Sequence, residues 1–176
     1  DPGFIVDKKD DILGIILTHA HEDHIGAIAH LWPQLKCKIF ATPFTALLIK
    51  EKFKEKHIDI TSYLNIVQLN GTVNLDKFKI EYITLTHSIL EPNGLRIETP
   101  AGVILHTGDW KVDPNPLIGA NINSKRLKEI GNEGVLAMIC DSTNVFSIGK
   151  SGSESDVRKS MLNVMSRLKK RIIITS

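Results

Sequence analysis

The sequence predicts one layered α/β domain, and three observations support that prediction. With 176 residues, 42% of them hydrophobic, the chain is long enough and apolar enough to bury a hydrophobic core. Apolar segments of strand length alternate with segments of helical period, which is typical of sheets covered by helices. The sequence contains no internal repeat, low-complexity tract or block of like charge, so we expect a globular fold.

Eight segments are predicted to be strands, because each carries β-branched or aromatic residues and ends near a turn former. They span residues 12–17, 38–41, 64–69, 78–85, 95–98, 103–106, 135–140 and 171–175. The first of them, ILGIIL, is apolar throughout, as expected of a buried strand.

The first two helices are predicted in the N-terminal half of the chain. One spans residues 23–31 and the other runs from Pro43 to about residue 56. Thr42 can cap the second helix, and Pro43 suits its first position.

Two further helices are predicted in the C-terminal half. A short one covers residues 124–130 and is expected to end at Gly131. The last is the clearest, because Ser153 and Asp156 form a capping box. Its apolar side chains fall on one stripe, which we expect to belong to the core: Val157, Met161, Val164, Met165 and Leu168.

Composition and charge argue against several classes of protein. The longest apolar stretch is about a third of a bilayer span, and no segment resembles a signal peptide, so we expect a cytoplasmic protein without a membrane partner. Cys37 and Cys140 lie outside any CxxC pattern and are predicted to be small core residues. The net charge of +2 is too small to indicate a partner by itself.

The segment THAHEDH, residues 18–24, places three imidazoles and two carboxylates directly after the first apolar strand. In an extended turn, side chains two positions apart point the same way, so His19 and His21 can converge on one cation. Asp23 and His24 enter a helix and more naturally serve a second cation nearby. Nitrogen and oxygen ligands together suit zinc or manganese, so the spacing predicts a dinuclear hydrolase. A polar turn with a capping aspartate is the alternative, and it fits Asp23 alone.

Two later strand ends offer further ligands. His87 follows the strand 78–85 and can complete a three-histidine shell. Gly108 lets the backbone turn sharply and presents Asp109, whose carboxylate can bridge two cations. His106 is predicted to be a structural residue inside its strand, and Glu22 is expected to face solvent.

The motifs LTHAHEDHIGA, THSI and HTGDWK resemble those of the metallo-β-lactamase superfamily. The segment CDSTN, followed by SGSE, resembles the beta-CASP nucleases, and the whole chain is similar to the bacterial ribonuclease J family. This resemblance implies a partial αββα sandwich with mixed sheets flanked by helices. Residues 1–176 would then form the central part of a metallo-β-lactamase domain, with about 150–176 leading toward a beta-CASP domain.

The resemblance also implies roles for particular residues. His19, His21 and His87 would hold one metal ion, Asp23 and His24 the other, with Asp109 between them. Asp23 would accept or relay the proton of the attacking water. Asp141 matches the acidic residue of the first beta-CASP motif and would support the site and its substrate contacts, with Ser142 as a phosphate neighbour; without the resemblance, a capping role for Asp141 is equally plausible.

The function that the resemblance implies is that of a cytoplasmic ribonuclease that uses two divalent ions, zinc or manganese. Such enzymes cut RNA internally and trim it from a 5′-monophosphate end, in messenger decay and ribosomal RNA maturation, and we expect a homo-oligomer at full length. The chain starts at Asp1 without the superfamily's first aspartate motif and ends at IIITS without a closing histidine. We therefore interpret it as an internal fragment that is inactive or weakly active alone.

Two other interpretations are open. A thioesterase or lactonase of the same superfamily would use HxHxDH equally well, although CDSTN argues against it. A scaffold or RNA-binding paralogue would keep the fold without catalysis, but such a protein would not require all six candidate metal ligands.

Overall fold

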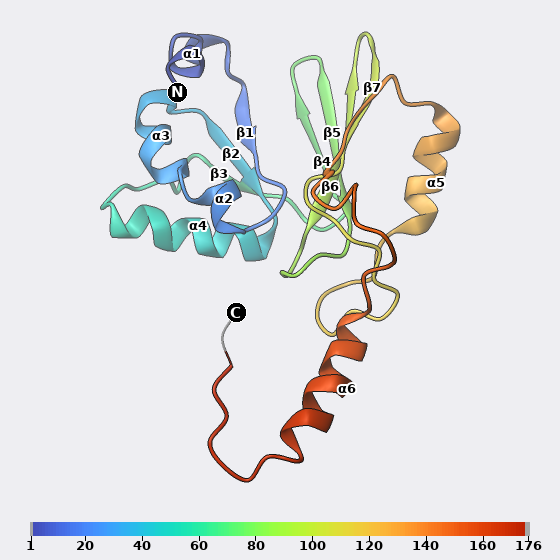
Figure 1. The fold of residues 1–176 in the computed structure, drawn as a ribbon. Coiled ribbons are helices and arrows are strands. Elements are labelled where there is room, and N and C mark those ends of the chain that lie inside the picture. The colour runs from blue at the N-terminus through green and yellow to red at the C-terminus, as the bar shows by residue number, and fades with distance from the viewer. Residues whose placement is uncertain (1, 175–176) are drawn as a thin grey trace.

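The computed structural model describes residues 2–174, and its strands form two sheets (Figure 1). The first sheet has three parallel strands in the order β1 (Gly14–Ile16), β2 (Lys38–Ala41) and β3 (Leu64–Ile66). The second has five, in the order β4 (Thr72–Leu75), β5 (Phe78–Thr84), β6 (Asn93–Thr99), β7 (Gly102–His106) and β8 (Ala137–Ile139). Strands β4 to β7 pair antiparallel and β8 pairs parallel with β7, so this sheet is mixed.

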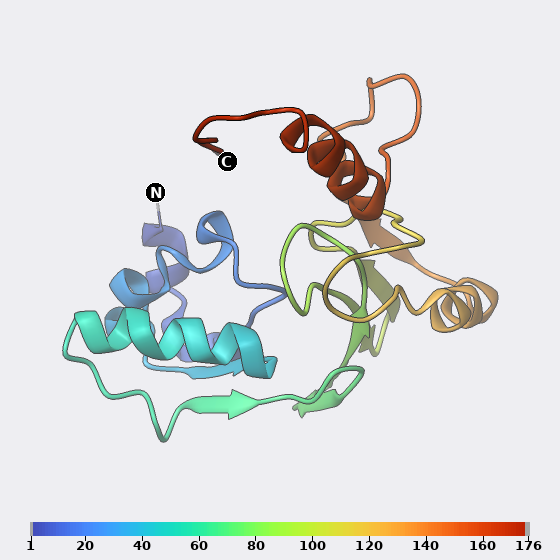
Figure 2. The same cartoon turned by 90° about the horizontal axis from the view of Figure 1, so that it is seen from below.

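Helices lie on the outer faces of the two sheets, as Figures 1 and 2 show. The first sheet is covered by α3 (Ile28–Leu35) and α4 (Pro43–Glu55), which follow the short α2 (Glu22–Ile25). The second is covered by α5 (Ser124–Glu133). The chain begins with α1 (Gly3–Val6) and a 3₁₀ turn (Lys9–Asp11), and α6 (Glu154–Met165) follows β8. The layers are helix, sheet, sheet and helix, which confirms the αββα prediction.

Three apolar clusters fill the three spaces between these layers. The cluster between the helices and the first sheet includes Ala29, Trp32, Ile39, Ile49 and Phe53. The cluster between the sheets includes Phe40, Val67, Val73, Ile80, Tyr82 and Leu95, and the one under α5 includes Ile83, Leu85 and Ile130. Successive side chains on a strand point to opposite faces, so neighbours such as Ile39 and Phe40 enter different clusters.

A hydrogen bond also joins the two sheets. The Tyr82 hydroxyl donates to the backbone oxygen of Phe40 over 3.0 Å. Burial raises the pKa of Tyr82 far above its usual value, so the hydroxyl keeps its proton at neutral pH and acts as the donor.

Most predicted strands are present, with shifted ends. Segment 38–41 is β2 with the predicted bounds, whereas β1 is shorter than the predicted 12–17. The sequence does not predict β4, a four-residue edge strand in which only Val73 and Leu75 carry the apolar alternation, too few for a clear pattern. Residues 171–174 form no strand, contrary to prediction, and Thr175 lies outside the described residues.

The helix predictions need two corrections. The predicted helix 23–31 is two helices, α2 and α3, which are separated at residues 26–27. The predicted end at Gly131 is wrong, because α5 continues to Glu133 and stops before Gly134, whose φ is +92°. A glycine inside a helix costs only about 1 kcal/mol relative to alanine. The full burial of Ile130 against the second sheet offsets this cost.

The last helix has the predicted start but not the predicted environment. Ser153 and Asp156 form the capping box of α6. Its stripe is not part of the core, since Val157 is 56% exposed and Val164 57%, and Leu168 lies beyond the end of the helix at Met165. Figure 1 shows the reason: α6 projects away from both sheets, and no described element packs on the stripe within residues 2–174.

The two cysteines differ in burial, and no described helix could span a bilayer. Cys37 is buried, as predicted, but the prediction for Cys140 is wrong because this residue is exposed just after the edge strand β8. Among residues 2–174, every helix is too short or too polar to cross a membrane.

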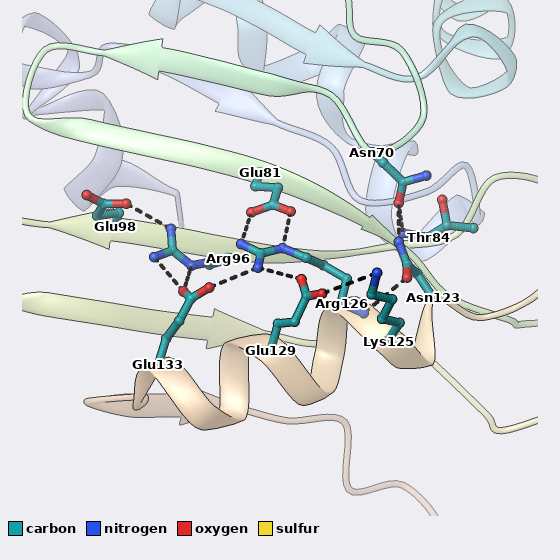
Figure 3. Close-up of polar contacts among 10 residues, drawn as sticks. All are labelled: Asn70, Glu81, Thr84, Arg96, Glu98, Asn123, Lys125, Arg126, Glu129 and Glu133. Atoms are coloured by element: carbon teal, nitrogen blue, oxygen red, sulfur yellow. Dashed lines mark hydrogen bonds and ion pairs between the residues drawn. The ribbon is translucent and has the colours of Figure 1, made fainter.

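A charged network fastens α5 to the second sheet (Figure 3). The Arg126 guanidinium donates to both carboxylate oxygens of Glu81 in β5, over 2.7 and 2.8 Å. It also donates to Glu129 and Glu133 on its own helix. Arg96 in β6 reaches Glu133 from the other side, so two guanidinium groups serve several carboxylates.

We expect Arg126→Ala to lower the free energy of unfolding by about 1–3 kcal/mol, because it removes a bidentate pair and leaves three carboxylates near one another. Urea denaturation measures the change. The control is Lys125→Ala, since the Lys125 side chain is 90% exposed and lies 4.0 Å from Glu129. The control should change stability by less than about 0.5 kcal/mol. Equal effects of the two variants would contradict a docking role for Arg126.

Candidate metal centre

The predicted ligands lie on three segments that end at the same place in the fold. His19 and His21 follow β1, and Asp23 and His24 lie on α2. The strands β5 and β7 are both antiparallel to β6 and therefore run in the same direction. The segments that follow them thus leave the sheet at the same end. One of these segments carries His87 and the other Asp109.

A bridge pins the His87 and Asp109 segments to each other. The backbone N–H of Lys111 donates to the Thr86 carbonyl over 2.9 Å. The Thr86 hydroxyl in turn donates to the Lys111 carbonyl over 2.5 Å. These bonds join Thr86, which precedes His87, to Lys111, two residues after Asp109, and so limit the relative movement of the two segments.

The first group of candidate ligands contains three imidazoles and one carboxylate. His21 Nδ1 lies 3.1 Å from Nε2 of His19 and 3.1 Å from Nε2 of His87. One oxygen of Asp109 is 3.8 Å from His87 Nε2. One donor atom from each residue lies within 4.8 Å of every other, which is close enough to surround a single cation.

The second group shares Asp109 with the first. His24 Nε2 lies 3.3 Å from Asp109 Oδ1 and 3.6 Å from Asp23 Oδ2. These three residues also offer donor atoms within 4.8 Å of one another. The two carboxylate oxygens of Asp109 thus face different groups, the arrangement that a bridging ligand of two cations needs.

The electrostatics of the first group favour a bound cation over protons. Burial, followed by the neighbouring His24 and His21, lowers the pKa of His19 to about 4. Burial and then His21 also lower the pKa of His87. Neutral imidazoles whose ring nitrogens face one another have too few protons to satisfy every lone pair, and protonating them all would bring like charges together. A divalent cation relieves both problems, so the donor set fits zinc or manganese.

A groove of about 710 Å³ opens beside the cluster. Its lining includes His87, Asp109, Lys111, Asp141, Thr143 and Lys150. The hydroxyl and backbone N–H of Thr143 hold Asp141 and lower its pKa, so its carboxylate is ionised at neutral pH. Ser142 is exposed, and its carbonyl accepts a hydrogen bond from Val145 N–H.

His106 and Glu22 lie as the sequence predicts, whereas two groove lysines carry no clear sequence signal. His106 is inside β7, where its Nδ1 accepts from Gly108 N–H over 2.9 Å, which agrees with a structural role. Glu22 is exposed and pairs with Lys52. No pattern in the sequence marks Lys111 or Lys150 as groove residues. Lys111 could have been found from its place two residues after Asp109, whereas Lys150 lies in a loop that carries no periodic signal.

Comparison with known proteins agrees with the fold. The family model described as "Beta-lactamase superfamily domain" matches residues 2–127. Ribonuclease J from Sinorhizobium meliloti is 39% identical over the whole chain, which covers 31% of that protein. Ribonuclease J from Helicobacter pylori is 37% identical, also over the whole chain, with 26% of the protein covered. The chain thus spans a third or less of the length of these relatives.

A solved structure shows the same fold. A protein of unknown function from Enterococcus faecalis superposes with a TM-score of 0.60 over 87% of this chain and 38% of that one, at 14% sequence identity. This likeness concerns the architecture alone. The family match and the similarity of the whole chain to part of ribonuclease J lead to one assignment: the chain belongs to the metallo-β-lactamase superfamily, as a relative of ribonuclease J.

Proposed function

We propose that this chain carries the metal centre of a nuclease that hydrolyses RNA phosphodiester bonds. The observation that carries the proposal is the convergence of His19, His21, His87 and Asp109 in one group and of Asp23, His24 and Asp109 in another. The names of the sequence relatives, ribonuclease J, support RNA as the substrate. Zinc is our first choice of metal and manganese the alternative, because both accept mixed nitrogen and oxygen ligands.

Two bound cations would polarise a phosphate and make water a nucleophile near neutral pH. The chain's own residues then have distinct tasks. Asp23, whose side chain is 76% exposed, can accept the water's proton and pass it to solvent. Asp109 holds the two ligand groups in register through its two oxygens.

The groove beside the cluster supplies the substrate path in this proposal. Lys111 and Lys150 line it and offer positive charge to phosphates. Asp141, which lines the groove, and the adjacent exposed Ser142 would contact the substrate. Asp141, held by Thr143, can accept hydrogen bonds from sugar hydroxyls or orient bound water.

We extend the proposal to the parent protein, since the chain spans only part of its relatives. Residues 1–176 would form the central part of the catalytic domain, with about 150–176 leading toward a beta-CASP domain. The parent would be a cytoplasmic homo-oligomer that degrades RNA from 5′-monophosphorylated ends and cuts it internally, in messenger decay and ribosomal RNA maturation.

Metal titration and substrate comparison test this function. The chain should bind two Zn²⁺ or Mn²⁺ ions, measured by calorimetry and elemental analysis. The natural full-length protein should then hydrolyse 5′-monophosphorylated single-stranded RNA in a metal-dependent manner and leave an acyl thioester untouched. Preferential turnover of the thioester would favour a small-molecule hydrolase instead. Absence of bound metal in both proteins would favour a non-catalytic paralogue.

A further inference from the structure

A buried asparagine contacts all three segments that carry the candidate metal ligands. Asn93 is 1% exposed and lies at the start of β6, between the His87 and Asp109 segments. Its side-chain Nδ2 donates to the Thr18 carbonyl over 3.0 Å, and its backbone N–H donates to the same carbonyl over 3.1 Å. Thr18 immediately precedes His19, so one residue of the second sheet holds the end of the first.

The same side chain closes the loop that starts at His87. Asn93 Nδ2 also donates to the Glu91 carbonyl over 2.7 Å. Glu91 has a φ of +53°, a backbone conformation that residues other than glycine rarely adopt. Its carboxylate accepts a hydrogen bond from Phe44 N–H at the start of α4 over 2.8 Å. Such a backbone persists only where its surroundings hold it. The hydrogen bond from Asn93 is one of these supports.

Thr18 transmits the position of Asn93 to the metal ligands. The Thr18 hydroxyl lies 3.1 Å from His19 Nδ1. A proton on Nδ1, donated to this hydroxyl, leaves the Nε2 lone pair directed at His21 and the cluster. On the other side, Thr18 and the Asn93 carbonyl lie so close to Gly108 that a Cβ there would be 2.8 Å from the Asn93 oxygen. Gly108 directly precedes Asp109.

We propose that Asn93 is a positioning residue that, through Thr18, aims the His19 imidazole at the metal and sets its distance from Asp109. The inference rests on the proposed metal-dependent function and goes beyond its ligand set. The side-chain amide contributes only through its two donated bonds, since Asn93 Oδ1 is buried and has no hydrogen-bond partner among residues 2–174. An unpaired buried acceptor costs free energy, which an apolar side chain would avoid.

Asn93→Leu tests the proposal because leucine has the same number of side-chain heavy atoms and no donors. The Thr18 carbonyl would keep its bond from the backbone N–H of residue 93. Removal of the buried unpaired oxygen offsets the bond that the Glu91 carbonyl loses, so the fold should survive. Supporting groups behind a metal ligand typically contribute 10- to 100-fold to affinity. We therefore expect Co²⁺ or Zn²⁺ to bind roughly 10- to 100-fold more weakly, measured by competition with a chelator. The visible absorption spectrum of bound Co²⁺ should also change, while the thermal midpoint of the metal-free chain stays near that of the wild type.

Asn65→Leu is the matched control. Asn65 also donates from Nδ2 to two backbone carbonyls, those of Ile39 and Tyr63, but it lies in β3, which β2 separates from β1. This variant should leave the metal affinity and the Co²⁺ spectrum unchanged. An equal loss of affinity in both variants would show that general softening of the sheets is the cause and would overturn the proposal.

Thr18→Val gives a second arm: as a single variant it tests the Thr18 hydroxyl without the leucine substitution, and combined with Asn93→Leu it completes a double-mutant cycle. Valine keeps the shape of threonine and removes the hydroxyl beside His19 Nδ1. If Asn93 acts through Thr18, the double variant should lose about as much affinity as the more affected single variant. Fully additive losses would overturn the transmission through Thr18. If the wild type binds metal and Asn93→Leu binds it with the same affinity, this inference alone is overturned. If the wild type binds no metal, the proposed function is overturned as well.

Discussion

Asp109→Asn is expected to disrupt both metal positions at once, the largest functional effect of any single substitution in this chain. The variant keeps the shape of the side chain but removes the negative charge of the carboxylate, whose two oxygens face His24 and His87. Even supporting residues typically contribute 10- to 100-fold to metal affinity, so the loss of a bridging ligand should exceed about 100-fold. Titration with Zn²⁺, followed by elemental analysis, should show the stoichiometry falling from two ions to fewer than one.

Two comparison variants show whether the bridge is the cause. His24→Ala affects only the second group and should leave one bound ion. Glu22→Gln is the control, because Glu22 is an acidic residue of the same motif that faces solvent and pairs with Lys52. It should retain both ions. An Asp109→Asn variant that binds two ions with wild-type affinity would remove Asp109 from the ligand set.

Gly108→Ala is expected to have the largest effect on stability among small substitutions. Gly108 has a φ of +57°, and an added Cβ would lie 2.8 Å from the Asn93 carbonyl oxygen and 3.3 Å from Thr18 Cβ. The unfavourable backbone conformation costs about 1–3 kcal/mol and the crowding of backbone atoms about as much again. We therefore expect the free energy of unfolding to fall by about 2–6 kcal/mol in guanidinium denaturation, with weaker metal binding because Asp109 follows.

Gly131→Ala is the control for this substitution and should act in the opposite direction. Gly131 lies inside α5, and an added Cβ would have no atom within 4 Å. Replacing a helical glycine with alanine reduces the entropy of the unfolded chain and should raise the free energy of unfolding by about 0.5–1 kcal/mol. A Gly108→Ala variant as stable as Gly131→Ala would mean that the Asp109 turn tolerates rearrangement.

The candidate site could be predicted from the sequence to the extent that its geometry is local. His19, His21, Asp23 and His24 follow one apolar strand, so the alternation of an extended turn and the start of a helix decide where they point. His87 and Asp109 were assigned to strand ends by the same local reasoning. What the sequence could not supply is how near these ends lie to one another, because this depends on the antiparallel pairing of β5 and β7 with the strand between them.

Other features depended on contacts that no local pattern encodes. The stripe of α6 has the period of a core helix, yet Val157 and Val164 are exposed because the helix projects from both sheets. Cysteine is a residue type that is usually buried, but Cys140 is exposed because it follows β8, which lies at the edge of its sheet. The burial of a side chain depends on its neighbours in space, and these neighbours are set by how distant segments of the chain pack together.

Short-range chemistry in the chain thus decided the layered α/β class, most strands, the capping box of α6 and the identity of the candidate ligands. Only the folded structure decided that Asn93 reaches Thr18, that Lys150 borders the groove and that Asp109 faces two groups. The physical reason is one of range. Side-chain period and turn preference act over a few residues, whereas a metal centre needs sub-ångström agreement among segments up to 90 positions apart, which only tertiary packing provides.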